Sequence, residues 1–238
     1  MRAAGTIAWR ELGAWFRTPA GYVLAAAALV LNGLQLNAVA IGTGRRASTL
    51  VLETFLLNGA FIVEAVAVVM SIRLVLPQST APLLLSAPVH EREIVVGKFL
   101  GALGLLAAIT LASLYLPALI FVHGKVSLGH IAAGYLGMLL VGAAVLAIAS
   151  AAAASTRHGL IAIGITGALI GLMELSYYVA DIAEPTWRAW LRALAPVWNH
   201  QRSFRRGLLQ LSDVVYLLSI TYLGLLVATR SIARRRST

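Results

Sequence analysis

The sequence predicts an all-α polytopic membrane protein with six transmembrane helices, because it is rich in apolar residues, poor in charge and divided into long apolar runs. Of its 238 residues, 60% are hydrophobic and 12% are charged, with a mean hydropathy of +0.86. Soluble domains carry about 25% charged residues, so the composition excludes an ordinary soluble domain. The apolar runs are continuous rather than alternating, which favours spanning helices over a β-barrel.

Six runs reach the roughly 20 residues that an α-helix needs to cross a hydrocarbon core about 30 Å thick. The predicted spans are residues 20–41, 50–72, 94–122, 128–154, 160–180 and 211–229. The third contains Pro117, which should kink it because proline has no N–H to donate to the helix. We expect all six to belong to a single transmembrane domain.

The basic residues are distributed unevenly between the loops, and this predicts the orientation. Eleven Lys and Arg residues lie on the side of the N-terminus, three lie in short loops on the other side, and five lie in the long loop 181–210. Cytoplasmic loops are enriched in Lys and Arg. Both termini, including the basic tail 230–238, are therefore expected in the cytoplasm, and the net charge of +10 reflects topology rather than nucleic-acid binding.

Residues 1–19 are expected to form an amphipathic helix at the membrane interface. On a helical wheel one face carries Ala4, Ala8, Leu12 and Trp15, and the opposite face carries Thr6, Arg10, Gly13 and Arg17. Trp15 is expected to anchor this helix in the interface, and Pro19 should end it.

A second interfacial helix is expected in the outer loop, over residues 184–195. Pro185 suits the first helical turn, and Pro196 follows the end. The apolar stripe consists of Trp187, Trp190, Leu191 and Leu194. We expect this helix to lie flat against the outer leaflet.

Three glutamates in the spans are candidates for an intramembrane polar path, because charges inside a membrane are costly. Glu53 and Glu64 are eleven residues apart, which returns them to nearly the same helix face, and Glu174 lies toward the outer end of the fifth span. One interpretation is a path for a substrate or a proton. In the other, Glu53 and Glu174 lie at headgroup depth and Glu64 pairs with a buried partner.

No enzyme motif is found, so any nucleotide hydrolysis is expected on another chain. The sequence has no H-E-x-x-H, no G-x-S-x-G and no P-loop lysine motif. It has no cysteine, which excludes disulfides and thiolate metal sites. The histidines lie in predicted loops or at span edges and lack metal-ligand spacing; they are His90, His123, His130, His158 and His200.

Two further patterns each allow two interpretations. Gly97-x-x-x-Gly101 and Gly167-x-x-x-Gly171 have the spacing that lets helices approach closely, either within one subunit or between two copies. The basic run Arg202, Arg205 and Arg206 would either meet lipid phosphates on the outer face or be solvated.

The loop between the second and third spans, residues 73–93, is the most informative. Pro77 and Pro82 bracket a polar tetrad, after which Leu83–Val89 forms a short apolar patch that ends in a charged run. An apolar patch framed by prolines at the cytoplasmic face suits a surface that docks into another protein. The alternative is a re-entrant or interfacial loop.

Four stretches follow one another along nearly the whole chain: Glu11–Val23 (ELGAWFRTPAGYV), Leu83–Lys98 (LLLSAPVHEREIVVGK), Ala133–Gly137 with Ser150–His158, and Trp198–Tyr216. Together they resemble type-2 ABC transporter permeases, in particular the branch associated with gliding motility and nitrous-oxide-reductase maturation. In the last stretch the residues in register are His200, Phe204, Gly207, Asp213 and Tyr216.

The resemblance implies a permease subunit in the bacterial inner membrane that exports its substrate. It implies pairing with a second permease copy or paralogue, and with cytoplasmic ATPase subunits that bind ATP and Mg²⁺; this chain itself would bind no cofactor and no metal. The ATPase would dock on a coupling segment at Pro82, Leu83, Leu84, Leu85 and Pro88. The N-terminal helix would act as a lateral lever through Arg10, Trp15 and Arg17.

One departure bears on the partner. The family carries an acidic run before the LLL segment, whereas Val75–Leu83 has no acidic residue here. This leaves open a different ATPase partner, weaker coupling, or docking through the partner permease.

The runner-up function is a non-transporting scaffold or maturation subunit that signals to an extracytoplasmic accessory protein. An intramembrane enzyme that uses the glutamates is a third hypothesis.

Overall fold

The computed structural model describes residues 2–40, 47–75, 90–123 and 126–237, and every regular element among them is a helix. The helices are α1 (Arg2–Phe16), α2 (Pro19–Ala40), α3 (Ser48–Leu74), α5 (Glu91–Ala112), α6 (Tyr115–His123), α7 (Leu128–Ser155), α8 (Gly159–Ile182), α9 (Pro185–Leu194), a π-helical turn η1 (Pro196–His200), α10 (Gln201–Arg205) and α11 (Leu211–Ser237).

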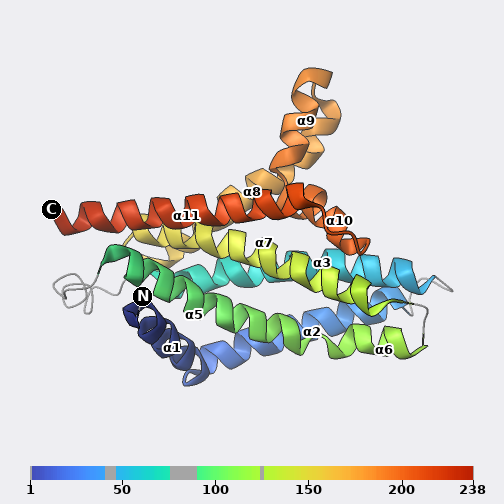
Figure 1. Cartoon of the computed structure of the whole chain (residues 1–238), viewed down its shortest axis with the longest axis horizontal. Coiled ribbons are helices and arrows are strands. Elements are labelled where there is room, and N and C mark those ends of the chain that lie inside the picture. The colour runs from blue at the N-terminus through green and yellow to red at the C-terminus, as the bar shows by residue number, and fades with distance from the viewer. Residues whose placement is uncertain (1, 41–46, 76–89, 124–125, 238) are drawn as a thin grey trace.

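Within the described residues, six helical stretches are long and apolar enough to cross a membrane: α2, α3, α5 with α6, α7, α8 and α11. Each coincides with one of the six predicted spans, so the prediction of an all-α polytopic membrane protein is confirmed. Both chain termini lie toward one end of the bundle, which we call the terminal end; α6 and α10 lie toward the opposite, distal end (Figure 1).

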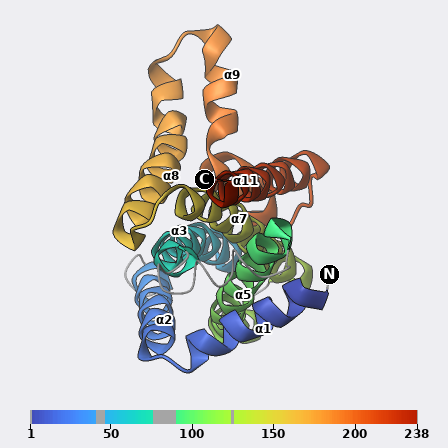
Figure 2. The same cartoon turned by 90° about the vertical axis from the view of Figure 1, so that its left-hand side faces the viewer.

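Helix α7 occupies the middle of the bundle and packs against α3, α5, α8, α10 and α11 (Figure 2). Its sequence is rich in alanine and glycine, so neighbouring backbones approach closely. Helix α11 approaches its backbone closely: a Cβ added to Gly224 would lie 2.7 Å from the Ala147 carbonyl carbon. Dispersion contacts between such small residues are a main source of helix association in lipid.

The third span is broken, as Pro117 predicts. Helix α5 ends at Ala112 and α6 begins at Tyr115. Pro117 cannot donate to the carbonyl of Ser113, which is the residue at the break. The Ser113 carbonyl instead accepts a hydrogen bond of 3.0 Å from the Leu116 N–H, so the group freed at the break has a partner inside the protein. The Ser113 hydroxyl lies 2.7 Å from the Thr110 carbonyl oxygen and 2.9 Å from the Tyr135 hydroxyl.

Helix α1 crosses the bundle near the terminal end and packs against α5 (Figure 2). A Cβ at Gly97 would lie 2.7 Å from Ile7 Cβ, and one at Gly101 would lie 2.7 Å from Glu11 Cβ. The first glycine pair therefore serves packing within the subunit. In the second pair, a Cβ added to Gly167 would lie 3.6 Å from Val68, and one added to Gly171 would meet no atom within 4 Å.

The structure differs from the expected interfacial anchor at Trp15, which is only 5% exposed and packs into the core. The apolar stripe of α1 is covered by α5, because Gly97 and Gly101 leave room for it. Trp9, at 79% exposure, is the tryptophan of α1 that faces outward. Arg10 and Arg17 are also exposed, as the sequence predicts for the polar face.

The C-terminal part of α8 and the whole of α9 form a hairpin that projects sideways from the bundle (Figures 1 and 2). No residue of α9 is buried, and Trp187 and Trp190 are exposed. The hairpin extends across the long axis of the bundle, which is the direction expected for a helix in the plane of the membrane. Its place at the outer leaflet stays a prediction.

The tight α1–α5 contact predicts that Gly101→Ala lowers stability by roughly 1–3 kcal/mol, because the added methyl group overpacks the interface. The matched control is Gly171→Ala, which has open space around it and should be neutral or stabilising by up to about 1 kcal/mol. Thermal unfolding of both variants in one detergent measures the difference. If both variants changed the unfolding temperature by the same amount, the tight α1–α5 contact would be contradicted.

Candidate functional site

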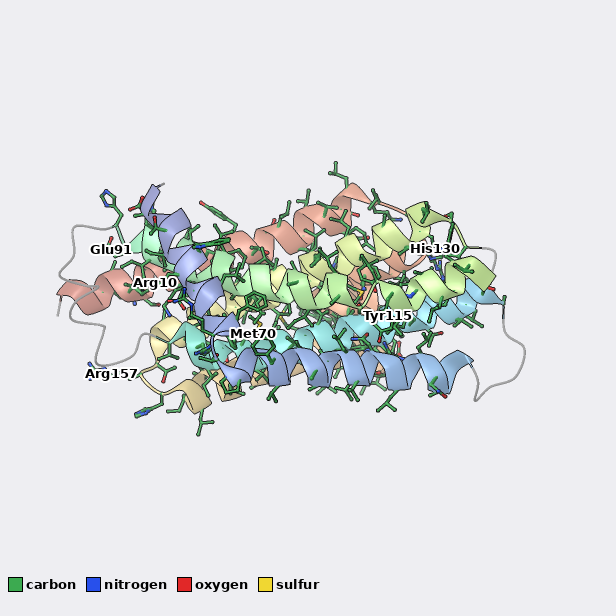
Figure 3. All side chains as sticks on the ribbon, turned by 90° about the horizontal axis from the view of Figure 1, so that it is seen from below. Arg10, Met70, Glu91, Tyr115, His130 and Arg157 are labelled. Atoms are coloured by element: carbon green, nitrogen blue, oxygen red, sulfur yellow. The ribbon has the colours of Figure 1, made fainter. Side chains whose placement is uncertain are left out.

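A cluster of polar and aromatic side chains at the terminal end joins three helices, and we call it the α1 junction. It consists of Glu11 and Trp15 from α1, Thr18 from the turn after it, Arg73 from the last turn of α3 and Lys98 from α5. Figure 3 shows the neighbouring Arg10 and Glu91 at this end of the bundle, far from His130.

Arg73 holds the turn between α1 and α2. Its guanidinium donates to the Thr18 hydroxyl at 2.9 Å and lies 4.6 Å from the centre of the Trp15 ring, a cation–π distance. The Thr18 hydroxyl also lies 3.1 Å from the Ala14 carbonyl oxygen, at the end of α1, where carbonyl groups lack helical partners. Pro19 then starts α2, a position that proline tolerates.

Lys98 links α5 to the other two helices. Its ammonium group donates to the Arg73 carbonyl at 3.1 Å and lies 3.7 Å from a carboxylate oxygen of Glu11. Lys98 is only 8% exposed, so its charge needs these partners. The Arg73 carbonyl belongs to the last turn of α3, where a cation is favoured by the helix dipole.

The α1 junction is next to the predicted coupling segment in the sequence. Arg73 and Lys98 belong to the two helices that precede and follow residues 76–89. Pro82, Leu83, Leu84, Leu85 and Pro88 lie outside the described residues, so their role stays a prediction. What the structure adds is that α1 is bonded to both flanking helices.

Two of the three candidate glutamates come together. Glu64 of α3 is 4% exposed, and its carboxyl group interacts with that of Glu174 of α8. Glu174 also accepts a hydrogen bond of 2.8 Å from the Val197 backbone, while one oxygen of each carboxyl group is buried without a partner. Glu64 and Glu174 therefore lie close together, and both interpretations, a polar path and a structural pairing, stay predictions. Glu53 lies elsewhere, in a distal cavity.

Sequence reasoning missed a buried cluster that joins the hairpin to α11. His200, expected in a loop, is buried. Its Nδ1 lies 2.9 Å from an oxygen of Asp213, its Nε2 lies 2.8 Å from the Ala193 carbonyl oxygen, and its ring stacks on Tyr216 at 3.6 Å. The Tyr216 hydroxyl donates to the Leu194 carbonyl at 2.8 Å. His200, Asp213 and Tyr216 thus hold the end of α9 against the start of α11.

The signal for this cluster was present in the stretch Trp198–Tyr216, where the family resemblance aligns His200, Asp213 and Tyr216. The spacing alone gives no helical or strand periodicity, because a turn separates the three residues. Across the described ranges of the chain, no group of three His, Asp or Glu residues could hold a metal ion.

The sequence matches no model of a known protein family, and no curated protein matches it. Function is therefore inferred from the geometry of the residues themselves.

A double-mutant cycle on Glu11→Gln and Lys98→Met tests the α1 junction. Glu11→Gln should lower stability by roughly 1–3 kcal/mol, because it leaves a buried ammonium group without its carboxylate. The double variant should lose less stability than the sum of the losses in the two single variants. Arg10→Gln, an exposed change on the same helix, should alter stability by at most about 0.5 kcal/mol. Strict additivity would mean that the two side chains do not interact.

Asp213→Asn should loosen the hairpin, because it weakens a charge-assisted hydrogen bond worth about 1.5–3 kcal/mol. We expect limited proteolysis within residues 183–196 to become roughly tenfold faster. Asp181→Asn is the control: Asp181 pairs with Arg192 at 2.6 Å, but both side chains are exposed, and such pairs contribute at most about 1 kcal/mol. Equal cleavage of the two variants would argue against the cluster as the hairpin's attachment.

Proposed function

We propose that this chain is the membrane-spanning permease subunit of an ATP-driven type-2 ABC transporter, an exporter of the bacterial inner membrane. The observation that carries the proposal is the α1 junction, which bonds a transverse helix to both helices flanking residues 76–89. A separate ATPase subunit that pressed on this segment would act on three helices at once. The family resemblance of Glu11–Val23 and Leu83–Lys98 supports the same assignment.

In the proposed mechanism, closure of an ATPase dimer with ATP and Mg²⁺ displaces residues 76–89. Arg73 and Lys98 transmit the displacement to α3, α5 and the transverse α1. Since α1 continues into α2 through a two-residue turn, the lateral helix and the first span move together. Rocking of these helices against the α7 and α11 pair would open a path between this chain and a second permease copy or paralogue.

The proposed orientation places the terminal end in the cytoplasm. Arg10 and Arg157 lie at this end in Figure 3, together with the start of α5 at Glu91. The uneven distribution of basic residues between the loops supports this side as cytoplasmic. An ATPase would then have direct access to residues 76–89.

A second candidate function is a scaffold that transmits the conformational change of the ATPase to an extracytoplasmic partner. The observation that favours it is the projecting α8–α9 hairpin, which carries the exposed Trp187 and Trp190 and whose end is joined to α11 through His200 and Asp213. Movement of α11 would move the hairpin. A transporter and a scaffold of this kind would share the cytoplasmic coupling step and differ in whether substrate crosses the membrane.

The proposal predicts that the tagged chain, purified in mild detergent from its native host, carries a stoichiometric P-loop ATPase with vanadate-sensitive turnover. Leu84→Asp should abolish that association while the bundle stays folded, because a charge in the apolar patch opposes docking. Leu160→Asp is the matched control, since Leu160 is exposed at the start of α8 near the same end. Normal assembly with Leu84→Asp would refute the coupling assignment.

A further inference from the structure

A small cavity at the distal end combines three cations with two aromatic rings. It has a volume of about 240 Å³ and is lined by Glu53, Tyr177, Trp198, Arg202, Arg205 and Arg206. Its size suits a small anion or a headgroup rather than a drug-sized molecule, since pockets for such molecules occupy roughly 300–1,000 Å³.

The charges in this cavity are not balanced by the protein. Three guanidinium groups face one carboxylate, that of Glu53, and within the described part of the chain none of the three arginines forms an ion pair. The Arg205 Nε is buried and has no hydrogen-bond partner. Burial lowers the pKa of the Arg205 guanidinium and the charge of Glu53 opposes this shift, but arginine stays protonated in proteins. A buried donor with a permanent charge calls for an anion.

The arginines are held in place by the fold. Arg202, Arg205 and Arg206 recur at helical spacing, so α10 and the residue after it present them on one side. Helix α10 is fixed through Gln201, whose side chain donates to the Leu56 carbonyl at 3.3 Å, and through Phe204, which is fully buried beside Gly137. The Arg205 carbonyl also accepts a hydrogen bond from the His130 ring.

The aromatic wall of the cavity is equally fixed. The Trp198 ring stacks on Tyr177 at 5.4 Å and meets Phe61 edge-on at 5.5 Å. These contacts join η1 to α8 and α3, so the aromatic wall keeps its geometry without a ligand. A wall that is already ordered loses little freedom on binding.

From these observations we propose that the cavity binds a phosphate-bearing anion through Arg202, Arg205 and Arg206. Guanidinium groups bind phosphate oxygens with paired, charge-assisted hydrogen bonds. Glu53 would accept a hydrogen bond from a hydroxyl or ammonium group next to the phosphate. Such a phosphate comes either from a phospholipid headgroup or from a free phosphate compound. The site does not depend on the proposed transport function.

Two probes distinguish the sources. Inorganic phosphate is titrated calorimetrically into the full chain in an uncharged maltoside detergent at low salt. In parallel, the chain is placed in nanodiscs of phosphatidylcholine with phosphatidylglycerol, and retained lipid is counted by native mass spectrometry. The double variant Arg202→Gln, Arg205→Gln should weaken binding of the bound probe by about tenfold or more, because two charge-assisted contacts are lost.

Arg157→Gln is the control, because it removes one positive charge from an exposed site at the terminal end. It should leave binding unchanged. Glu53→Gln should have the opposite effect on affinity. It removes the carboxylate found among the described lining residues, so inorganic phosphate should bind roughly threefold to tenfold more tightly.

Arginine-dependent binding of inorganic phosphate alone would identify a free phosphate compound as the ligand, and arginine-dependent retention of phosphatidylglycerol alone would identify a lipid headgroup. Either result supports the site. The proposal is overturned if neither probe distinguishes the wild type from the double variant. Should that variant not fold, unchanged or weaker phosphate binding by Glu53→Gln would overturn it instead.

Discussion

The ammonium group of Lys98 is the constraint on which the terminal end of the molecule depends. It lies almost fully buried on α5, where its partners among the described residues are the Arg73 carbonyl of α3 and the Glu11 carboxylate of α1. A buried charge without partners is strongly destabilising, so the three helices must stay together. The glycines at 97 and 101 let α1 approach closely enough for Glu11 to reach Lys98. Packing and electrostatics therefore favour the same arrangement.

Elsewhere the polar groups of the bundle are similarly concentrated at points where elements meet. Asn32 and Gln35 of α2 bond to each other, and Gln35 also donates to the Phe55 carbonyl of α3. Glu64 meets Glu174 where α8 starts to leave the bundle, and His200 meets Asp213 where the chain returns to it. Because lipid offers no hydrogen bonds, each of these groups depends on a neighbouring segment. The polar contacts thus fix how the apolar helices are arranged.

The six spans and the break at Pro117 could be predicted from the sequence, because the length of an apolar run and the missing N–H of proline are local properties. The polar and apolar faces of α1 were also predictable, but not what covers the apolar face. A stripe ending in Trp15 fits a lipid surface as well as another helix, and only the glycines of α5 decide between them. The pairing of Glu64 with Glu174 and the burial of His200 depend on contacts between residues far apart in the chain, which no periodicity encodes. Residues Pro82–Pro88 lie outside the described residues, so the prediction that they couple to an ATPase rests on the sequence alone.

The proposed mechanism requires α1 to move together with residues 76–89 when a partner ATPase acts on them. It is tested most directly by pulsed electron paramagnetic resonance between spin labels at Trp9→Cys on α1 and Leu128→Cys on α7, both exposed positions in a chain without native cysteine. The complex with its ATPase would be measured without nucleotide and after trapping with ATP and vanadate. We expect the α1–α7 distance distribution to shift on trapping, and this shift to be lost in Lys98→Met. The same distribution in both states, in a complex that hydrolyses ATP, would contradict it.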